Sequence, residues 1–186
     1  FHVSQSVGNN NPAPQPWPPL RGRCTVARML PSEQSVRVSA PAKVNLHLRV
    51  GPPTPDGFHP LSSWMVTVGL FDILEFVPHV AQPGISLLCD DPAIPTDDSN
   101  LIVKTASALL DERSKAKPND RAVVGVAAAL QKRIPVGAGL GGGSSDGAFT
   151  LLTLNRLLDL NWPIERLSEL AARYAASRVL AVDASV

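Results

Sequence analysis

The sequence predicts an α+β domain, and two observations favour that class. Stretches with the two-residue period of β-strands come first, and stretches with helical spacing are mixed in after them. These stretches do not alternate regularly, as the strand–helix–strand units of a parallel sheet would. The chain has 186 residues, of which 44% are hydrophobic and 18% charged. This is the composition of a globular protein with a sizeable core.

The first strand is expected to begin at residue 36. From Lys43 to Val50 polar and apolar residues alternate, which is the period of a half-buried strand and places Lys43 and Asn45 on one face. Turn-forming residues follow, and 64–70 and 71–77 are expected to be two further strands. A fourth candidate strand is 84–89. Residues 121–134 favour a strand because they begin with β-branched residues and end at a glycine-rich loop.

Three stretches have helical spacing. The first covers residues 95–115, and its Asp97, Asp98 and Ser99 are candidates for capping the amino end. The second follows the glycine-rich loop and carries apolar residues at intervals over 148–158. The third covers 163–176 and has its proline at a position suited to a first helical turn.

Composition and charge disfavour several function classes. Seventeen Lys and Arg balance sixteen Asp and Glu, and a net charge of +1 offers no electrostatic footprint for nucleic acid or an acidic membrane surface. Cys24 and Cys89 are far apart and form no CxxC pair, so neither a disulfide framework nor a zinc site is expected. No apolar stretch approaches the roughly 20 residues of a membrane span. We expect a soluble, cytoplasmic protein that binds a small molecule, with a plastid location as the less favoured alternative.

A glycine-rich loop dominates the second half of the chain. Residues 134–148 contain six glycines and two serines, between an apolar stretch and a leucine-rich helix. A strand, a glycine-rich loop and a helix start in that order form an anion site, because the free N–H groups and the helix dipole point at the same place. The expected ligand is a phosphate group.

Two nucleotide-binding motifs match this loop in form only. A Walker loop that starts at Gly137 would need a lysine at position 143, where the chain has Gly143. Gly137, Gly139 and Gly142 satisfy the dinucleotide pattern GxGxxG, but one helix is followed here by another helix rather than by the next strand of a strand–helix–strand unit. Both motifs therefore lack the context that they require.

A hydrolase motif also matches. Residues 143–147 fit GxSxG, the nucleophile turn of hydrolases, but all four histidines lie upstream of the serine, so the usual order of the triad is not available. Ser144, Ser145 and Asp146 are more simply interpreted as residues that cap the following helix.

Four further stretches carry a family resemblance: "SAPAKVNLHLRV", "PDGFHPLSS", "SNLIVKTASALL" and "KRIPVGAGLGGGSSDGA". Together they resemble the small-molecule kinases named for galactokinase, homoserine kinase, mevalonate kinase and phosphomevalonate kinase. Within that family they are similar to the kinases that phosphorylate a methylerythritol hydroxyl of a cytidine diphosphate conjugate, in the non-mevalonate pathway to isoprenoids and terpenoids. The resemblance implies the N-terminal domain of such a kinase, with a mostly antiparallel sheet and helices on one face. It also implies ATP and Mg²⁺ as cofactors.

The resemblance implies nucleotide-binding roles for a set of residues. Asn100 and Lys132 match positions near the adenine nucleotide, and Ser144 or Ser145 helps to position Mg²⁺. The loop that would hold the phosphates of ATP consists of Pro135, Val136, Gly137, Ala138, Gly139, Leu140, Gly141, Gly142, Gly143, Ser144 and Ser145.

The resemblance assigns four residues to catalysis and to the second substrate. Lys43 falls on the catalytic lysine, a cation that stabilises charge on the transferring phosphoryl group. Asn45 contacts the substrate, Phe58 replaces a usual tyrosine that stacks on the cytosine, and His59 hydrogen-bonds the base. Without the resemblance, a strand lysine is usually solvated and His59 beside a proline is ordinarily a turn residue.

The chain departs from the family pattern near its end. Ser177 stands where the family has a catalytic aspartate, and Asp183 lies six residues later. We expect a disordered, proline-rich lead-in at 1–35, a kinase N-terminal domain at 36–176 and a divergent tail at 177–186, with the second kinase domain absent. The chain is then either a truncated product or the translation of a gene whose frame or boundary is wrongly assigned near residue 174. The alternative is a nucleotide-binding module that has lost catalysis.

Overall fold

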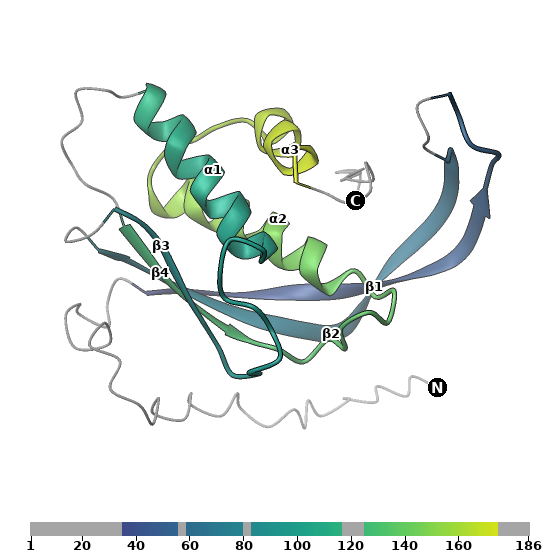
Figure 1. Cartoon of the computed structure of the whole chain (residues 1–186), viewed down its shortest axis with the longest axis horizontal. Helices are drawn as coiled ribbons and strands as arrows, with labels where there is room; N and C mark the ends of the chain where they lie inside the picture. Colours follow the sequence, from purple (N-terminus) through teal and green to yellow (C-terminus); the bar gives the residue numbers. More distant parts are fainter. Residues whose placement is uncertain (1–34, 56–58, 80–82, 117–124, 175–186) are drawn as a thin grey trace, which may run out of the picture.

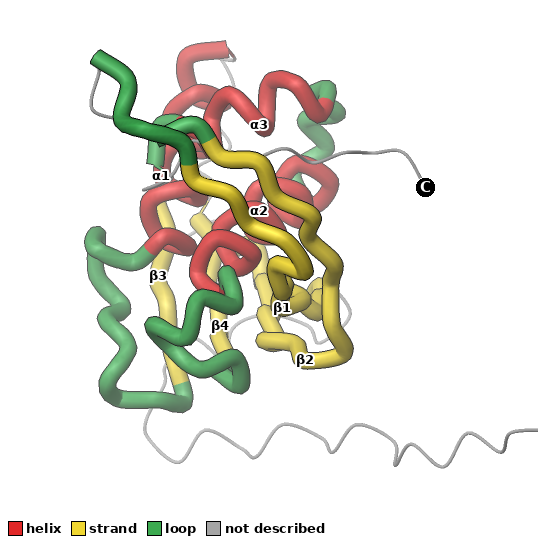
Figure 2. Tube along the Cα trace, turned by 90° about the vertical axis from the view of Figure 1, so that its right-hand side faces the viewer, coloured by secondary structure: helices red, strands yellow, loops and turns green. Residues whose placement is uncertain are grey.

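The computed structural model describes residues 35–55, 59–79, 83–116 and 125–174. In these ranges the helices lie together on one face of a sheet, as Figures 1 and 2 show from two directions. None of these helices is long and apolar enough to cross a membrane. The α+β class with helices on one face is confirmed. The elements in chain order are β1 (Val36–Val50), β2 (Leu61–His79), β3 (Gly84–Cys89), α1 (Leu101–Ala116), β4 (Gly125–Gln131), α2 (Gly142–Leu157) and α3 (Ile164–Ala172).

The sheet has the strand order β1-β2-β4-β3. β1 pairs with β2 and β2 with β4 in antiparallel fashion, whereas β3 and β4 are parallel. A parallel pair needs a crossover connection, and α1 provides it between β3 and β4. β4 therefore has a hydrogen-bonded neighbour on each side, and the glycine-rich loop starts from an interior strand.

The core lies between the sheet and the helices. Leu74 and Phe76 of β2 are fully buried, and Leu109 of α1 and Leu154 of α2 pack in the same cluster. Burial of each such side chain contributes about 1.5–3 kcal/mol. Because α2 is anchored by these contacts, its amino end has a fixed position relative to β4.

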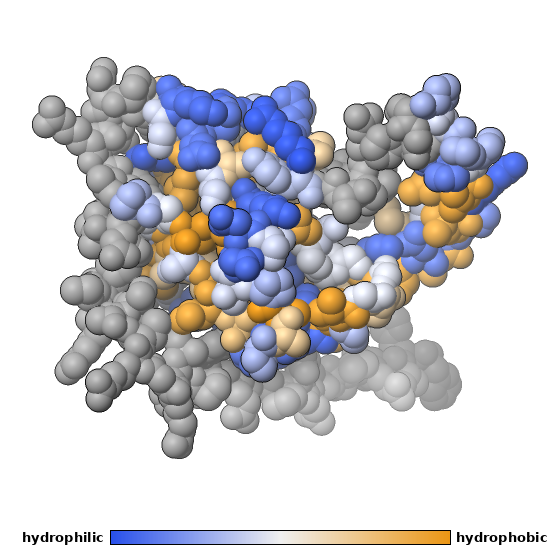
Figure 3. All heavy atoms as spheres, viewed as in Figure 1, coloured by the Kyte–Doolittle hydropathy of each residue, from blue (hydrophilic) through white to orange (hydrophobic). Residues whose placement is uncertain are grey.

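The outer part of the β1–β2 hairpin extends away from the helices as an arm (Figure 1). Its apolar side chains stay accessible: Trp64 is 70% exposed and Leu46 is 60% exposed. Figure 3 shows hydrophobic surface on this arm. A register shift between Asn45 and His47 also breaks the alternation. The prediction of a half-buried strand over 43–50 was therefore wrong for its outer part, because none of the described helices covers the arm.

The predicted pair of strands at 64–70 and 71–77 is one strand. β2 runs through both stretches, and Gly69 falls in a register shift opposite Pro41 and Ala42 rather than at a strand end. A glycine inside a strand often marks such an irregularity. The other predicted strands and the three predicted helices are confirmed as elements.

The amino ends of two helices also differ from expectation. Asn100 caps α1, because its side-chain oxygen accepts the N–H of Ile102 at 2.9 Å. Asp97 instead closes the preceding turn by accepting the N–H of Ser99 at 2.9 Å. Pro163 is the residue that precedes the first turn of α3 and lies outside that turn.

Two leucines of α2 test how far burial of this helix stabilises the fold. Leu154 is fully buried and Leu152 is 38% exposed. We expect Leu154→Ala to lower the free energy of unfolding in urea by about 2–5 kcal/mol, because it leaves a cavity. Leu152→Ala is the matched control and should cost less than about 1 kcal/mol. Equal losses for the two variants would contradict this packing of α2.

Candidate active site

The loop between β4 and α2 has a backbone that glycine alone adopts easily. Gly137, Gly139 and Gly141 have φ angles of +74°, +73° and +72°, and the residues between them do not have positive φ. Such alternation turns successive N–H groups toward one side and forms a concave anion site. The loop backbone therefore has the geometry that is expected of the predicted anion site.

The start of α2 carries no side-chain cap. Gly141 is the N-cap residue, and the first helical hydrogen bond runs from the N–H of Ser145 to the carbonyl of Gly141 at 2.9 Å. The N–H groups before it, those of Gly142, Gly143 and Ser144, have no acceptor within the helix. The prediction that Ser144, Ser145 and Asp146 cap this helix was wrong. The uncapped end leaves donors and the positive end of the helix dipole for a ligand.

A cavity of about 420 Å³ lies against the loop. Ligand sites commonly have volumes of roughly 300–1,000 Å³. The structure brings the predicted loop together with Asn100 and Lys132 around this cavity, whereas Ser145, Lys43 and Asn45 do not line it. Its lining consists of Pro135–Ser144 with Ile94, Pro95, Ser99, Asn100, Leu101, Leu130, Lys132 and Asp146.

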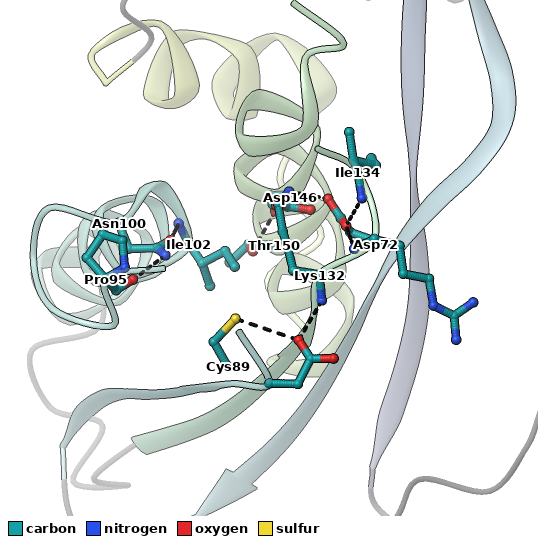
Figure 4. A network of polar contacts seen from close by, with 11 residues as sticks. Asp72, Cys89, Pro95, Asn100, Ile102, Lys132, Ile134, Asp146 and Thr150 are labelled. Atoms are coloured by element: carbon teal, nitrogen blue, oxygen red, sulfur yellow. Dashed lines mark hydrogen bonds and ion pairs between the residues drawn. The ribbon is translucent and has the colours of Figure 1, made fainter. Parts of the chain in front are cut away.

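Asn100 has a structural task in this site. Its side-chain oxygen caps α1, and its amide donates to the carbonyl of Pro95 at 2.7 Å (Figure 4). The side chain thus fixes the wall of the cavity. Its predicted contact with the adenine nucleotide stays a prediction.

Lys132 lies between two buried carboxylates (Figure 4). Its ammonium donates to Asp72 and, at 3.2 Å, to Asp146. The side chains of Lys132, Asp72 and Asp146 are 8%, 0% and 4% exposed. The two acids come from β2 and α2, so one lysine joins three elements of the fold.

The backbone at the start of the loop is held by carboxylates as well. Asp72 Oδ1 accepts the N–H of Arg133 at 2.6 Å and that of Ile134 at 2.9 Å. Asp90 accepts the N–H of Lys132 at 2.8 Å. These three donors therefore find carboxylate acceptors where the ladder of β4 ends, and the start of the loop is rigidly attached to the sheet.

Burial shifts the pKa values of this cluster. Desolvation raises the pKa of Asp146 to about 7; the charge of Lys132 opposes the rise and that of Asp72 adds to it. Burial alone would lower the pKa of Lys132, but the two carboxylates outweigh it and hold the pKa above its usual value. Asp146 Oδ1 finds no hydrogen-bond donor among the described residues. The cluster therefore favours a charged lysine, and Asp146 gains a proton as the pH falls below about 7.

Lys43 lies on β1 beside the end of the loop. Its backbone N–H donates to the carbonyl of Leu140 at 2.9 Å, and its ammonium donates to Asn45 Oδ1 at 2.6 Å. The expected common face of Lys43 and Asn45 is therefore present. A side chain at Gly141 would begin 3.1 Å from Lys43 Cγ, so the glycine makes room for the lysine stem.

One further predicted site residue, His59, is not brought to the loop. His59 lies in the connection at the outer end of the β1–β2 arm and shares a hydrogen bond at 2.8 Å between its Nδ1 and the carbonyl of Gly51. Phe58 and Ser177 lie outside the described residues.

Sequence reasoning missed Asp72 and misinterpreted Asp146. The signal for Asp72 was an acid within the apolar stretch 71–77, where a strand buried against helices needs a partner for its charge. For Asp146 a cap was the simpler interpretation, because residues that follow a loop often fill that role. Only the packing of α2 against β2 reveals the lysine that pairs with both.

The donors in this site suit a triphosphate. Uncapped N–H groups, a concave loop and a lysine beside it are features that bind phosphate oxygens. Among the residues that the structure describes, no group of three or more His, Cys, Asp or Glu side chains could hold a metal ion. A Mg²⁺ ion that arrives with phosphates needs few protein ligands.

Comparison with known proteins assigns the class. Residues 100–182 match the family model for the N-terminal domain of the GHMP kinases. The crystal structure of a 4-(cytidine 5'-diphospho)-2C-methyl-D-erythritol kinase superposes with a TM-score of 0.57 at 34% identity, over 77% of this chain and 47% of that chain. The sheet and helices described above therefore have the fold of a GHMP kinase N-terminal domain.

The relatives define the branch of the family. Over 76% of its length the chain is 50% identical to the 4-diphosphocytidyl-2-C-methyl-D-erythritol kinase of Prochlorococcus marinus (strain MIT 9313) and covers 42% of that protein. Over 73% of its length it is 46% identical to the protein of the same name from Desulfotalea psychrophila, of which it covers 44%. The chain is thus a homologue of these kinases over about three quarters of its own length and spans less than half of theirs.

Two neighbouring glycines test the packing around Lys132. A side chain at Gly142 would begin 2.8 Å from Lys132 Nζ and 3.1 Å from Ile134 Cβ, whereas one at Gly143 would meet only Leu101 Cδ1 at 3.7 Å. We expect Gly142→Ala to lower the free energy of unfolding by about 1–3 kcal/mol through overpacking. Gly143→Ala is the matched control and should be neutral or slightly stabilising. The two variants are compared by urea unfolding, and equal stabilities would contradict the contact.

Asp146 predicts a pH dependence of stability. The folded chain binds this proton more tightly than the unfolded chain, because the pKa rises from 3.8 to about 7. The stabilisation is complete below pH 3.8 and is lost as the pH rises through 7. Asp146→Asn cannot ionise, so its stability relative to the wild type should increase from pH 5 to pH 8 in urea unfolding. Asp111→Asn on the exposed side of α1 is the control, and a pH-independent difference for Asp146→Asn would contradict the prediction.

Proposed function

We propose that this chain is the ATP-binding part of a kinase that phosphorylates a methylerythritol hydroxyl of 4-diphosphocytidyl-2-C-methyl-D-erythritol, in isoprenoid biosynthesis by the non-mevalonate route. The observation that carries the proposal is the uncapped start of α2 behind a loop with alternating positive φ angles, with Lys43 packed against Gly141. The relatives of that name, at 46–50% identity, support the choice of substrate.

The proposed roles follow from position and charge. The N–H groups of the loop and of the first turn of α2 bind the phosphates of ATP, and the hydroxyl of Ser144 or Ser145 helps to hold Mg²⁺, which would shield phosphate charge during transfer. Asn100 and Lys132 lie on the wall of the cavity where the nucleoside is expected.

Lys43 is proposed to act on the transferring group. Its ammonium is held by Asn45 and is half-buried at the carboxyl side of the loop, next to the start of α2. A cation fixed there lowers the proton affinity of an acceptor hydroxyl and stabilises charge on the phosphoryl oxygens. Asn45 orients both the lysine and the substrate, and Phe58 and His59 are proposed to bind the cytosine.

A second candidate function is nucleotide binding without phosphoryl transfer. It is favoured by Ser177, which replaces the family's catalytic aspartate, since a serine is a poor base near neutral pH. We propose that the domain boundaries are 36–176 for the kinase N-terminal domain, with 1–35 and 177–186 outside it.

The two candidates are separated by two measurements on the same preparation. Titration with a fluorescent ATP analogue detects binding, and conversion of 4-diphosphocytidyl-2-C-methyl-D-erythritol with ATP detects transfer. Saturable binding with turnover supports the kinase, and saturable binding without turnover supports the binding module. Absence of binding contradicts both.

Replacement of the proposed catalytic lysine gives the sharpest expected result. Lys43→Met should lower kcat by about 10²–10³, since it removes one electrostatic contact with the reacting group. Its affinity for the ATP analogue should fall far less than its turnover. Lys115→Met, which removes a lysine that is 73% exposed on α1, is the matched control and should keep both values. Unchanged turnover in Lys43→Met would remove the lysine from the mechanism.

A further inference from the structure

The ion pairs of Lys132 connect the two ends of the phosphate loop. Lys132 follows directly after β4, where the loop starts, and Asp146 lies in α2, shortly after the loop ends. Asp72 of β2 pairs with the same lysine and also accepts the first two loop N–H groups, those of Arg133 and Ile134. Both ends of the loop are thus tied to one interior strand through one ammonium group.

We propose that Lys132 is a positioning residue, which pairs with Asp72 and Asp146 to fix both ends of the loop and so sets the spacing of the N–H groups that receive the triphosphate. The inference rests on the proposed function, because it assigns the loop to phosphate binding. It adds to that function the residues that hold the loop in its binding conformation before the ligand arrives.

The geometry supports an action through the loop. Two of the three N–H donors of the ammonium are used by Asp72 and Asp146. The ammonium lies 2.8 Å from the position where a side chain at Gly142 would begin, so it is held directly against the first turn of α2. The buried ammonium of Lys132 has little freedom to move toward a ligand, because its two carboxylate partners hold it in place. The loop backbone that it supports, in contrast, faces the cavity.

Burial makes the cluster strong enough to hold a loop. With exposures of 8% or less, the three side chains are shielded from the salt and water that weaken surface ion pairs. A loop that is already in its bound conformation loses less conformational entropy when the phosphates bind. Removing the cluster should therefore weaken binding of the phosphate groups and leave binding of the base unchanged.

The variant must cut the connection without leaving two buried carboxylates side by side with no cation between them. Lys132→Met alone exposes two buried carboxylates to each other and is expected to fold poorly. Lys132→Met/Asp146→Asn removes the link to α2 but leaves Asp72 with its two backbone donors. Lys115→Met, an exposed lysine in an ion pair with Glu112, is the matched control.

Calorimetric titration with three probes tests the proposal. In Lys132→Met/Asp146→Asn, the affinities for ATP and for inorganic tripolyphosphate should both fall about tenfold, while the affinity for adenosine stays within about twofold. Lys115→Met should match the wild type for all three. Loss of adenosine and ATP binding with tripolyphosphate unchanged would mean that Lys132 contacts the base, and this would overturn the proposal. Unchanged binding of all three probes would overturn it as well.

Hydrogen exchange in the ligand-free protein separates this proposal from the proposed function. The N–H groups of Lys43 and Ser145 are bonded to the carbonyls of Leu140 and Gly141, both at 2.9 Å, and report the position of the loop. In the double variant they should exchange about tenfold faster, while the N–H of Ala128 in β4 stays protected. If the wild type binds neither ATP nor tripolyphosphate, the proposed function fails, and exchange alone decides whether Lys132 positions the loop. Unchanged exchange of both reporters would refute that role.

Discussion

The placement of one buried ammonium group between two carboxylates is the constraint on which the rest of the site depends. Buried charges persist only when they are paired and hydrogen-bonded, so Lys132, Asp72 and Asp146 must be brought together for any of them to be buried. Their meeting requires β2, β4 and α2 to be packed in one arrangement. That arrangement in turn fixes where the glycine-rich loop starts and where it ends.

The glycines of the loop serve the protein's own lysines as well as a ligand. Gly141 leaves room for the stem of Lys43, and Gly142 leaves room for the ammonium of Lys132. The positive φ angles at alternate positions bend the backbone so that its N–H groups converge. A loop with larger residues would lose the concave surface and would also separate the two lysines from the start of α2. Packing and the proposed phosphate binding thus impose the same requirement.

The domain holds the glycine-rich loop rigidly and leaves the outer β1–β2 arm exposed. The phosphate loop is braced by interior strands and by a buried ion cluster, whereas the outer β1–β2 arm keeps Leu46 and Trp64 largely exposed. Rigid positioning suits a group that must bind phosphates without reorganisation. His59, which is proposed to bind the second substrate, lies at the outer end of the arm. The glycine-rich loop and His59 therefore differ in how firmly the described chain holds them.

The sequence by itself determined the fold class, most elements and the position of the glycine-rich loop, because periodicity and glycine spacing act over a few residues. It also carried the family resemblance through four ordered stretches. The tertiary structure decided the cap at Asn100, the continuity of β2 across Gly69, the exposure of the arm and the ion cluster. Lys132 and Asp72 are 60 residues apart in the chain. No local pattern encodes which buried charges meet, since that pairing is fixed only when strands and helices pack against one another.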